Sequence, residues 1–75
     1  MKEYDIVATY HNACGGAAHP QRWLDEAKVH DPADYIREKH GYEYEKFVRE
    51  ERPDGRIVYT FDNGAIAWIY EFTEV

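Results

Sequence analysis

Residues 3–10 alternate between two sets of side chains, and this alternation predicts the first strand. One side of that strand carries Tyr4, Ile6, Ala8 and Tyr10. The following segment, residues 11–19, contains the pair Gly15-Gly16 and several small side chains, so it has little to bury and is predicted to be a loop.

A short helix is predicted to begin at Pro20, because proline is well tolerated at the first helical position. Trp23, Leu24 and Ala27 then recur at three- and four-residue spacing, which would place them on one side of that helix.

A second helix is predicted over residues 32–40. Asp31 can cap its N-terminus, Pro32 fixes φ in the first turn, and Gly41 ends it. A single helix that is kinked near Asp31 is the alternative.

Three more strands are predicted, over residues 44–52, 56–62 and 65–72. Pro53-Asp54-Gly55 is typical of a type I turn with a glycine bulge, and Asn63-Gly64 is typical of a two-residue type I′ turn. The predicted fold is therefore α+β: an N-terminal strand, two short helices or one kinked helix, and a three-stranded antiparallel meander packed on them, in one domain over residues 1–75.

Strand alternation gives the meander an aromatic face and an opposite face. Closing the last hairpin at Asn63-Gly64 would pair Asp62 with Ala65, and closing the preceding turn would pair Arg52 with Arg56. We expect the aromatic face to form a core of Tyr59, Phe61, Ile66 and Trp68, with Trp23, Leu24 and Ile36 of the helices packed on it. The opposite face would stay open as a binding surface that carries Glu50, Val58, Thr60, Asp62, Ala67, Ile69 and Glu71. The alternative is a mixed face that water covers without any partner.

The composition indicates a folded, acidic chain. The 75 residues are 44% hydrophobic and 16% aromatic, which excludes a disordered chain, and their net charge is −6 with histidines neutral. An acidic chain is a poor ligand for nucleic acid and prefers a basic protein partner. An acidic surface that serves only solubility is the alternative.

The histidines and the single cysteine form the one cluster with metal-like spacing. His11, Cys14 and His19 follow a His-x2-Cys-x4-His pattern, and His30 could supply a fourth ligand. The same loop could hold a thiol nucleophile, with Cys14 beside glycine amides and a histidine base. We nevertheless predict neither a bound metal nor catalysis, because the spacing supplies only half of a zinc pattern and 75 residues offer little room for a water-excluding cleft.

These observations predict a non-enzymatic protein-binding module with a basic partner, without cofactor, direct nucleic-acid contact or membrane contact. In size, acidity and lack of a catalytic signature the chain is similar to small phage-encoded inhibitors, including anti-CRISPR proteins. This resemblance of class implies an inhibitor that occupies a nucleic-acid-binding surface. A single cysteine, no signal-peptide pattern and no long apolar stretch favour the cytoplasm. A homodimer that joins open sheet faces or edge strands is a third possibility.

Overall fold

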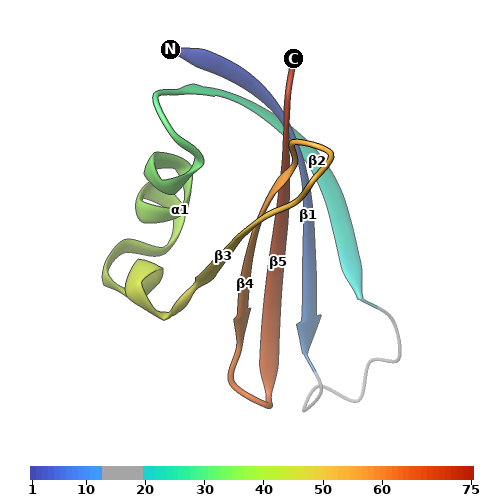
Figure 1. Cartoon of the computed structure of the whole chain (residues 1–75). Coiled ribbons are helices and arrows are strands. Elements are labelled where there is room, and N and C mark those ends of the chain that lie inside the picture. Colours follow the sequence, from blue (N-terminus) through green and yellow to red (C-terminus); the bar gives the residue numbers. More distant parts are fainter. Residues whose placement is uncertain (13–19) are drawn as a thin grey trace.

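The computed structural model describes residues 1–12 and 20–75, which form one antiparallel sheet with a helix on one face (Figure 1). The elements in chain order are β1 (Lys2–Asn12), β2 (Gln21–Val29), α1 (Pro32–His40), the 3-10 helix η2 (Gly41–Lys46), β3 (Val48–Glu51), β4 (Ile57–Asp62) and β5 (Ile66–Glu74). The strand order across the sheet is β2-β1-β5-β4-β3. The helical segment therefore connects one edge strand to the other.

The predicted combination of two helices and a three-stranded meander is wrong, because the described residues form a five-stranded antiparallel sheet with one α-helix and one 3-10 helix. Residues 21–29 are strand β2, which pairs with β1 from Lys2 opposite Val29 to Tyr10 opposite Gln21. This pairing outweighs the helix propensity of the leucine, glutamate, alanine and lysine in the segment. The predicted strand over residues 44–52 is also too long, since η2 occupies its beginning and β3 starts at Val48.

The helix predicted over residues 32–40 is confirmed at both ends. The Asp31 carboxylate accepts a hydrogen bond from the backbone N–H of Ala33 at 2.9 Å, and Pro32 fills the first turn. At the other end Gly41 has φ of +59°, a conformation that favours glycine, and its N–H donates to the Arg37 carbonyl.

The turn between β3 and β4 is also confirmed. The Arg52 N–H donates to the Arg56 carbonyl at 2.8 Å, and Gly55 has φ of +93°. The strands continue from this turn with Glu51 opposite Ile57, so the predicted pairing of Arg52 with Arg56 is correct. Phe47 consequently lies beside Phe61, with ring centroids 5.5 Å apart.

The β4–β5 turn differs from its prediction by two residues. Asp62 lies opposite Ala67 rather than Ala65, and the Asn63 N–H donates to the Ile66 carbonyl at 3.1 Å. The Asn63 side chain caps the turn by accepting from the N–H groups of Ala65 and Ile66 at 2.9 and 2.8 Å. Because side chains alternate with period two, a shift of two residues leaves every side chain on its predicted face.

The core lies between α1 and the central strands. Phe72 is 0% exposed and meets the rings of Tyr4, Tyr35 and Tyr59 edge to face, with centroids 6.0, 5.5 and 6.1 Å apart. Ile36 anchors the helix in this cluster, as predicted, and is fully buried. Aromatic contacts of this kind fix the distance between the helix and the sheet.

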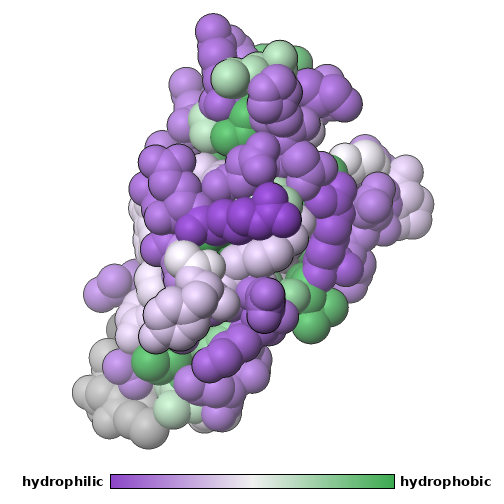
Figure 2. Space-filling model, turned by 90° about the vertical axis from the view of Figure 1, so that its left-hand side faces the viewer, coloured by the Kyte–Doolittle hydropathy of each residue, from purple (hydrophilic) through white to green (hydrophobic). Residues whose placement is uncertain are grey.

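The rest of the predicted core is only partly correct. Tyr59 is buried, whereas Phe61, Ile66 and Trp68 are half-buried. Leu24 is 78% exposed, because on strand β2 it lies on the opposite face from Trp23. The view from the helix side shows mainly hydrophilic atoms over the helix, with pale and apolar atoms reaching the surface below it (Figure 2).

Candidate protein-binding face

The sheet face opposite α1 is not covered by any described element, and we call it the uncovered face. The register brings all the predicted binding residues together there. Glu50 lies opposite Val58 and Val58 opposite Glu71, while Thr60 lies opposite Ile69 and Asp62 opposite Ala67. We call this group of Glu50, Val58, Thr60, Asp62, Ala67, Ile69 and Glu71 on β3, β4 and β5 the acidic half.

Two glutamates of the acidic half are held by arginines of the β3–β4 turn. Arg52 Nε lies 3.4 Å from a carboxylate oxygen of Glu50, and an Arg56 nitrogen lies 3.5 Å from Glu71. Val58, 3% exposed, lies directly between these two glutamates. Long charged side chains can shield an aliphatic neighbour with their stems while their heads stay in water, so the acids and Val58 form one unit.

Of these two arginines, Arg56 also stiffens the turn. Arg56 binds Asp54 through two nitrogens at 2.8 and 2.9 Å, and its backbone N–H donates to the same carboxylate. The hydrogen bond from the Arg56 side chain is the main cause that lowers the pKa of Asp54. The turn that Arg56 and Asp54 fix therefore lies beside Glu50 and Glu71.

The uncovered face continues onto β1 and β2, which sequence analysis missed as part of the sheet. In this second half Leu24 lies opposite Val7, Glu26 opposite Asp5, and Arg22 opposite Thr9. The available signal was that apolar Trp23, Ala27 and Val29 fall at odd-numbered positions, although Asp25 interrupts this row. The leucine, glutamate, alanine and lysine in this segment favoured a helix prediction instead.

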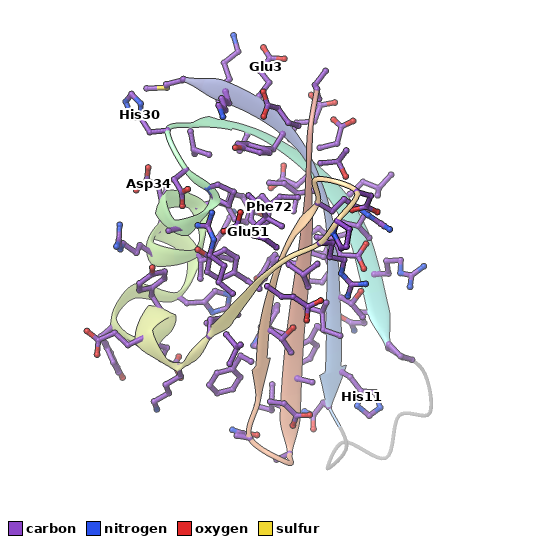
Figure 3. The ribbon with its side chains drawn as sticks, in the orientation of Figure 1. Glu3, His11, His30, Asp34, Glu51 and Phe72 are labelled. Carbon is purple, nitrogen blue, oxygen red and sulfur yellow. The ribbon has the colours of Figure 1, made fainter. Side chains whose placement is uncertain are left out.

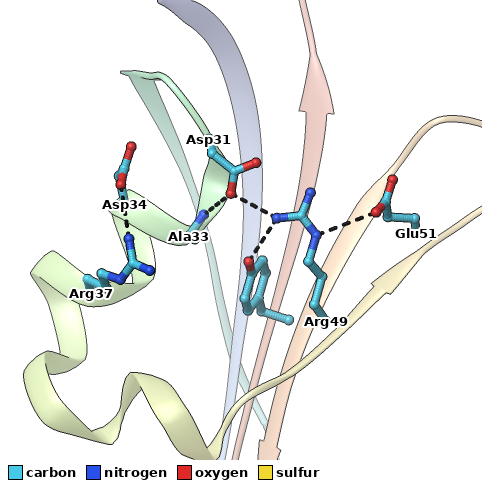
Figure 4. Close-up of polar contacts among 7 residues, drawn as sticks. Asp31, Ala33, Asp34, Arg37, Arg49 and Glu51 are labelled. Atoms are coloured by element: carbon cyan, nitrogen blue, oxygen red, sulfur yellow. Dashed lines mark hydrogen bonds and ion pairs between the residues drawn. The ribbon is translucent and has the colours of Figure 1, made fainter.

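The opposite face carries a polar network at the start of α1 (Figure 4). Arg49 donates to the Asp31 carboxylate at 2.8 Å and to the Tyr59 hydroxyl at 3.1 Å, and lies 3.7 Å from Glu51. Burial raises the pKa of Asp31, but the hydrogen bonds from Arg49 and Ala33 outweigh this effect, so the pKa is lowered overall. Asp31, Arg49 and Tyr59 line a pocket of about 580 Å³, yet they are hydrogen-bonded to one another and fasten β3 to the helix.

A smaller aromatic pocket of about 270 Å³ lies at the C-terminal end of α1, where His40, Trp23 and Trp68 meet Tyr70. The His40 ring nitrogen Nε2 and the Tyr70 hydroxyl are 2.7 Å apart. Burial raises the pKa of Tyr70 to about 12. Burial and nearby Lys39 lower the pKa of His40, although Glu43 opposes them, which favours the neutral imidazole. In the tautomer that leaves Nε2 unprotonated, this nitrogen accepts a hydrogen bond from the Tyr70 hydroxyl. The pair of His40 and Tyr70 therefore contributes to packing at this end of the core.

The cysteine and histidine site, considered as an alternative from the sequence, lies mostly outside the described residues, since Cys14 and His19 belong to residues 13–19. His11 and His30 are described, and they lie at opposite ends of the sheet (Figure 3). His30 therefore cannot share a metal ion with His11. Residues 1–12 and 20–75 contain no group of three or more histidine, cysteine, aspartate or glutamate side chains that could hold a metal.

Comparison of the chain with protein-family models, curated proteins and solved structures finds no match. Neither helix in the described part of the chain has the length and apolar character needed to cross a membrane. Functional inference therefore rests on the uncovered face itself.

Proposed function

We propose that the chain is a non-enzymatic protein-binding module whose acidic half docks on a basic protein surface. The observation that carries this proposal is the arrangement of charge around an aliphatic centre. Ala67 and Ile69 lie on the central strand β5, with Glu71 next in the same row and Asp62 opposite Ala67. A partner that offers lysines and arginines around an apolar patch would match this surface.

Charge and apolar contact would contribute differently to such a complex. Carboxylates steer a cationic partner and raise the association rate, and the net charge of −6 adds to this attraction. Desolvated aliphatic side chains at the centre lower the dissociation rate. Because β4 and β5 are paired with neighbouring strands on both sides, little conformational entropy is lost on docking.

The partner proposed here is a protein that binds nucleic-acid phosphates with the same cationic surface. Occupation by carboxylates would exclude the nucleic acid, so the module would act as an inhibitor, in line with the class resemblance to phage-encoded inhibitors. A cytoplasmic location belongs to this proposal, since nucleic-acid-binding machines of a bacterial host reside there. Lone Cys14 fits a reducing compartment.

The test uses isotope-labelled protein titrated with an arginine- and leucine-rich peptide and followed by amide chemical shifts. We expect shifts concentrated on β3, β4 and β5, and affinity that falls as salt rises. The double variant Glu50→Lys/Glu71→Lys should lose most of the affinity. Glu38→Lys/Glu45→Lys is the matched control, because both residues are exposed, lie in α1 and η2, and change the net charge equally.

The same variants extend the test to natural partners. Immobilised wild-type protein and both double variants are incubated with a bacterial lysate, and bound proteins are eluted with duplex DNA. The proposal requires a protein that the wild type and the control retain, that Glu50→Lys/Glu71→Lys loses, and that DNA displaces. Equal retention by all three baits would contradict the proposal. Peptide affinity that does not change with salt concentration would contradict it as well.

A further inference from the structure

The outer edge of β2 is the most open pairing surface of the sheet. β2 has nine residues, whereas the other edge strand, β3, has four residues and three of them are charged. In the described part of the chain, no strand pairs with the outer side of β2. Long edge strands are templates for a further strand, and proteins usually shorten or block them.

We propose that two copies of the chain associate through β2, antiparallel, around a two-fold axis at Leu24. Each sheet would continue into the other, so that the uncovered faces of both copies form one surface. Such a contact is isologous: the same strand serves on both sides.

Symmetry restricts how two β2 strands can pair. A two-fold axis between antiparallel edge strands is perpendicular to the sheet, so the uncovered face of one copy continues the uncovered face of the other. Residues opposite each other must then share a face. With the axis at Leu24, Leu24 meets Leu24 of the second copy, and Arg22 meets Glu26 on each side of the axis.

Neighbouring registers are less favourable. An axis at Asp25 or Glu26 sets two carboxylates against each other, which destabilises a cross-strand pair. An axis at Trp23 places charged Arg22 against apolar Leu24. Axes nearer the ends of β2 shorten the paired region. On the uncovered face, the register at Leu24 combines an apolar contact at the centre with opposite charges around it; on the helix side it sets Trp23 against Asp25.

Two features of the single chain support the same register independently. Asp5 lies directly opposite Glu26 on the uncovered face, a like-charge pair that costs stability. In the dimer, Arg22 of the second copy would flank Glu26 from its other side and compensate that repulsion. Leu24, which is 78% exposed beside Val7, would be covered by its counterpart. One contact would thus account for an acidic pair and an exposed leucine.

The test is sedimentation equilibrium over a concentration series, at pH 7 and low salt. We expect the wild type to approach the mass of two chains as concentration rises. Arg22→Glu and Glu26→Arg, each alone, place like charges across the axis and should weaken association about tenfold or more. The double variant R22E/E26R exchanges the charges and should restore it.

An equimolar mixture of the two single variants gives the sharpest result. In the mixed dimer, the glutamate introduced by R22E in one copy would face the arginine introduced by E26R in the other. On the second side of the axis, the unchanged Glu26 of the first copy would face the unchanged Arg22 of the second. Every pair is then again opposite in charge, so we expect the mixture to associate more strongly than either variant alone.

Lys46→Glu is the matched control, because Lys46 is exposed in η2, away from β2, and its reversal changes the net charge as much as R22E does. It should leave association unchanged. Glu50→Lys/Glu71→Lys should also leave it unchanged, which separates this proposal from the one for the acidic half. A chain that stays monomeric throughout, or single variants and a mixture that behave like the wild type, would overturn the β2 dimer.

Discussion

The two faces of the sheet differ in how far their side chains are buried and bonded to one another. On the helix side, aromatic rings pack edge to face around Phe72, and the hydroxyls of Tyr35, Tyr59 and Tyr70 are hydrogen-bonded to Asp25, Arg49 and His40. On the uncovered face, aliphatic side chains alternate with charges that pair at the surface. The helix side holds the fold together, and we expect the exposed positions of the uncovered face to tolerate substitution, unlike buried Val58.

The same contrast explains why the uncovered face is suited to binding. Surface ion pairs contribute little to stability, commonly 0 to about 1 kcal/mol each, so their replacement is tolerated. A tyrosine hydroxyl buried with its partner is costly to disturb, because the partner is left unsatisfied. Substitutions should therefore separate the two faces by their effect on unfolding.

The largest effect is expected from Phe72→Ala at the centre of the ring cluster. Removal of a fully buried phenylalanine typically lowers the free energy of unfolding by about 3–5 kcal/mol, through lost transfer energy and a residual cavity. Urea denaturation followed by circular dichroism measures it. A loss below about 1 kcal/mol would show that the ring cluster does not hold the helix on the sheet.

A smaller loss is expected from Asp31→Ala, which removes the cap of α1 and the carboxylate bound to Arg49. We expect about 1–2 kcal/mol, near the upper part of the range for helix caps, because the Arg49 contact is lost as well. Asp34→Ala is the comparison, since its ion pair with Arg37 is exposed and 3.4 Å long. Equal losses in the two variants would contradict a special role for Asp31.

The next effect is a dependence of stability on pH that is due to His40. Burial lowers the pKa of His40 below its ordinary value of 6.5, so below that pH the unfolded chain takes up a proton before the folded chain does. The free energy of unfolding should therefore fall as pH decreases from about 6.5, until the folded histidine is also protonated. Denaturation curves at pH 7.5 and 5 measure the difference.

His40→Gln should flatten this part of the profile, because glutamine keeps a hydrogen-bonding group near Tyr70 without titrating. The lowered pKa of Asp31 does not interfere, since its contribution is lost only below its ordinary value of 3.8. An unchanged slope in the variant would assign the dependence to another group.

The smallest effect is expected on the uncovered face. Val48 is 68% exposed on β3, and Val48→Thr keeps a β-branched side chain there. We expect a change of less than about 0.5 kcal/mol in the free energy of unfolding. A loss that approaches that of Phe72→Ala would abolish the distinction between the faces.

Local signals in the sequence predicted the helix and one turn correctly, because their determinants lie within a few residues. Asp31, Pro32 and Gly41 fix the two ends of α1 by capping and φ preference. The strand β2 was missed for the opposite reason: its conformation depends on pairing with β1 across residues 13–19. Pairing of that kind overrides local propensity.

The residues of the acidic half share one face as predicted, although the predicted register of β4 and β5 was wrong. The β4–β5 turn is displaced by two residues, but Val58, Ala67 and Ile69 still share a face because the displacement is even. The β1–β2 half of that face, with Leu24 and Glu26, could not be predicted once the segment that begins at Pro20 had been assigned to a helix.

The strand order also determines how the chain reaches its folded state. The pairing of β1 with β5 joins Tyr4 to Glu74, so the two central neighbours of the sheet are almost the most distant segments of the described sequence. The β1–β2 hairpin and the β3–β4–β5 segment can each form locally, but the sheet closes only when they meet. Contacts between such distant segments slow the search for the native topology, so refolding should be slower than for a helical protein of this length.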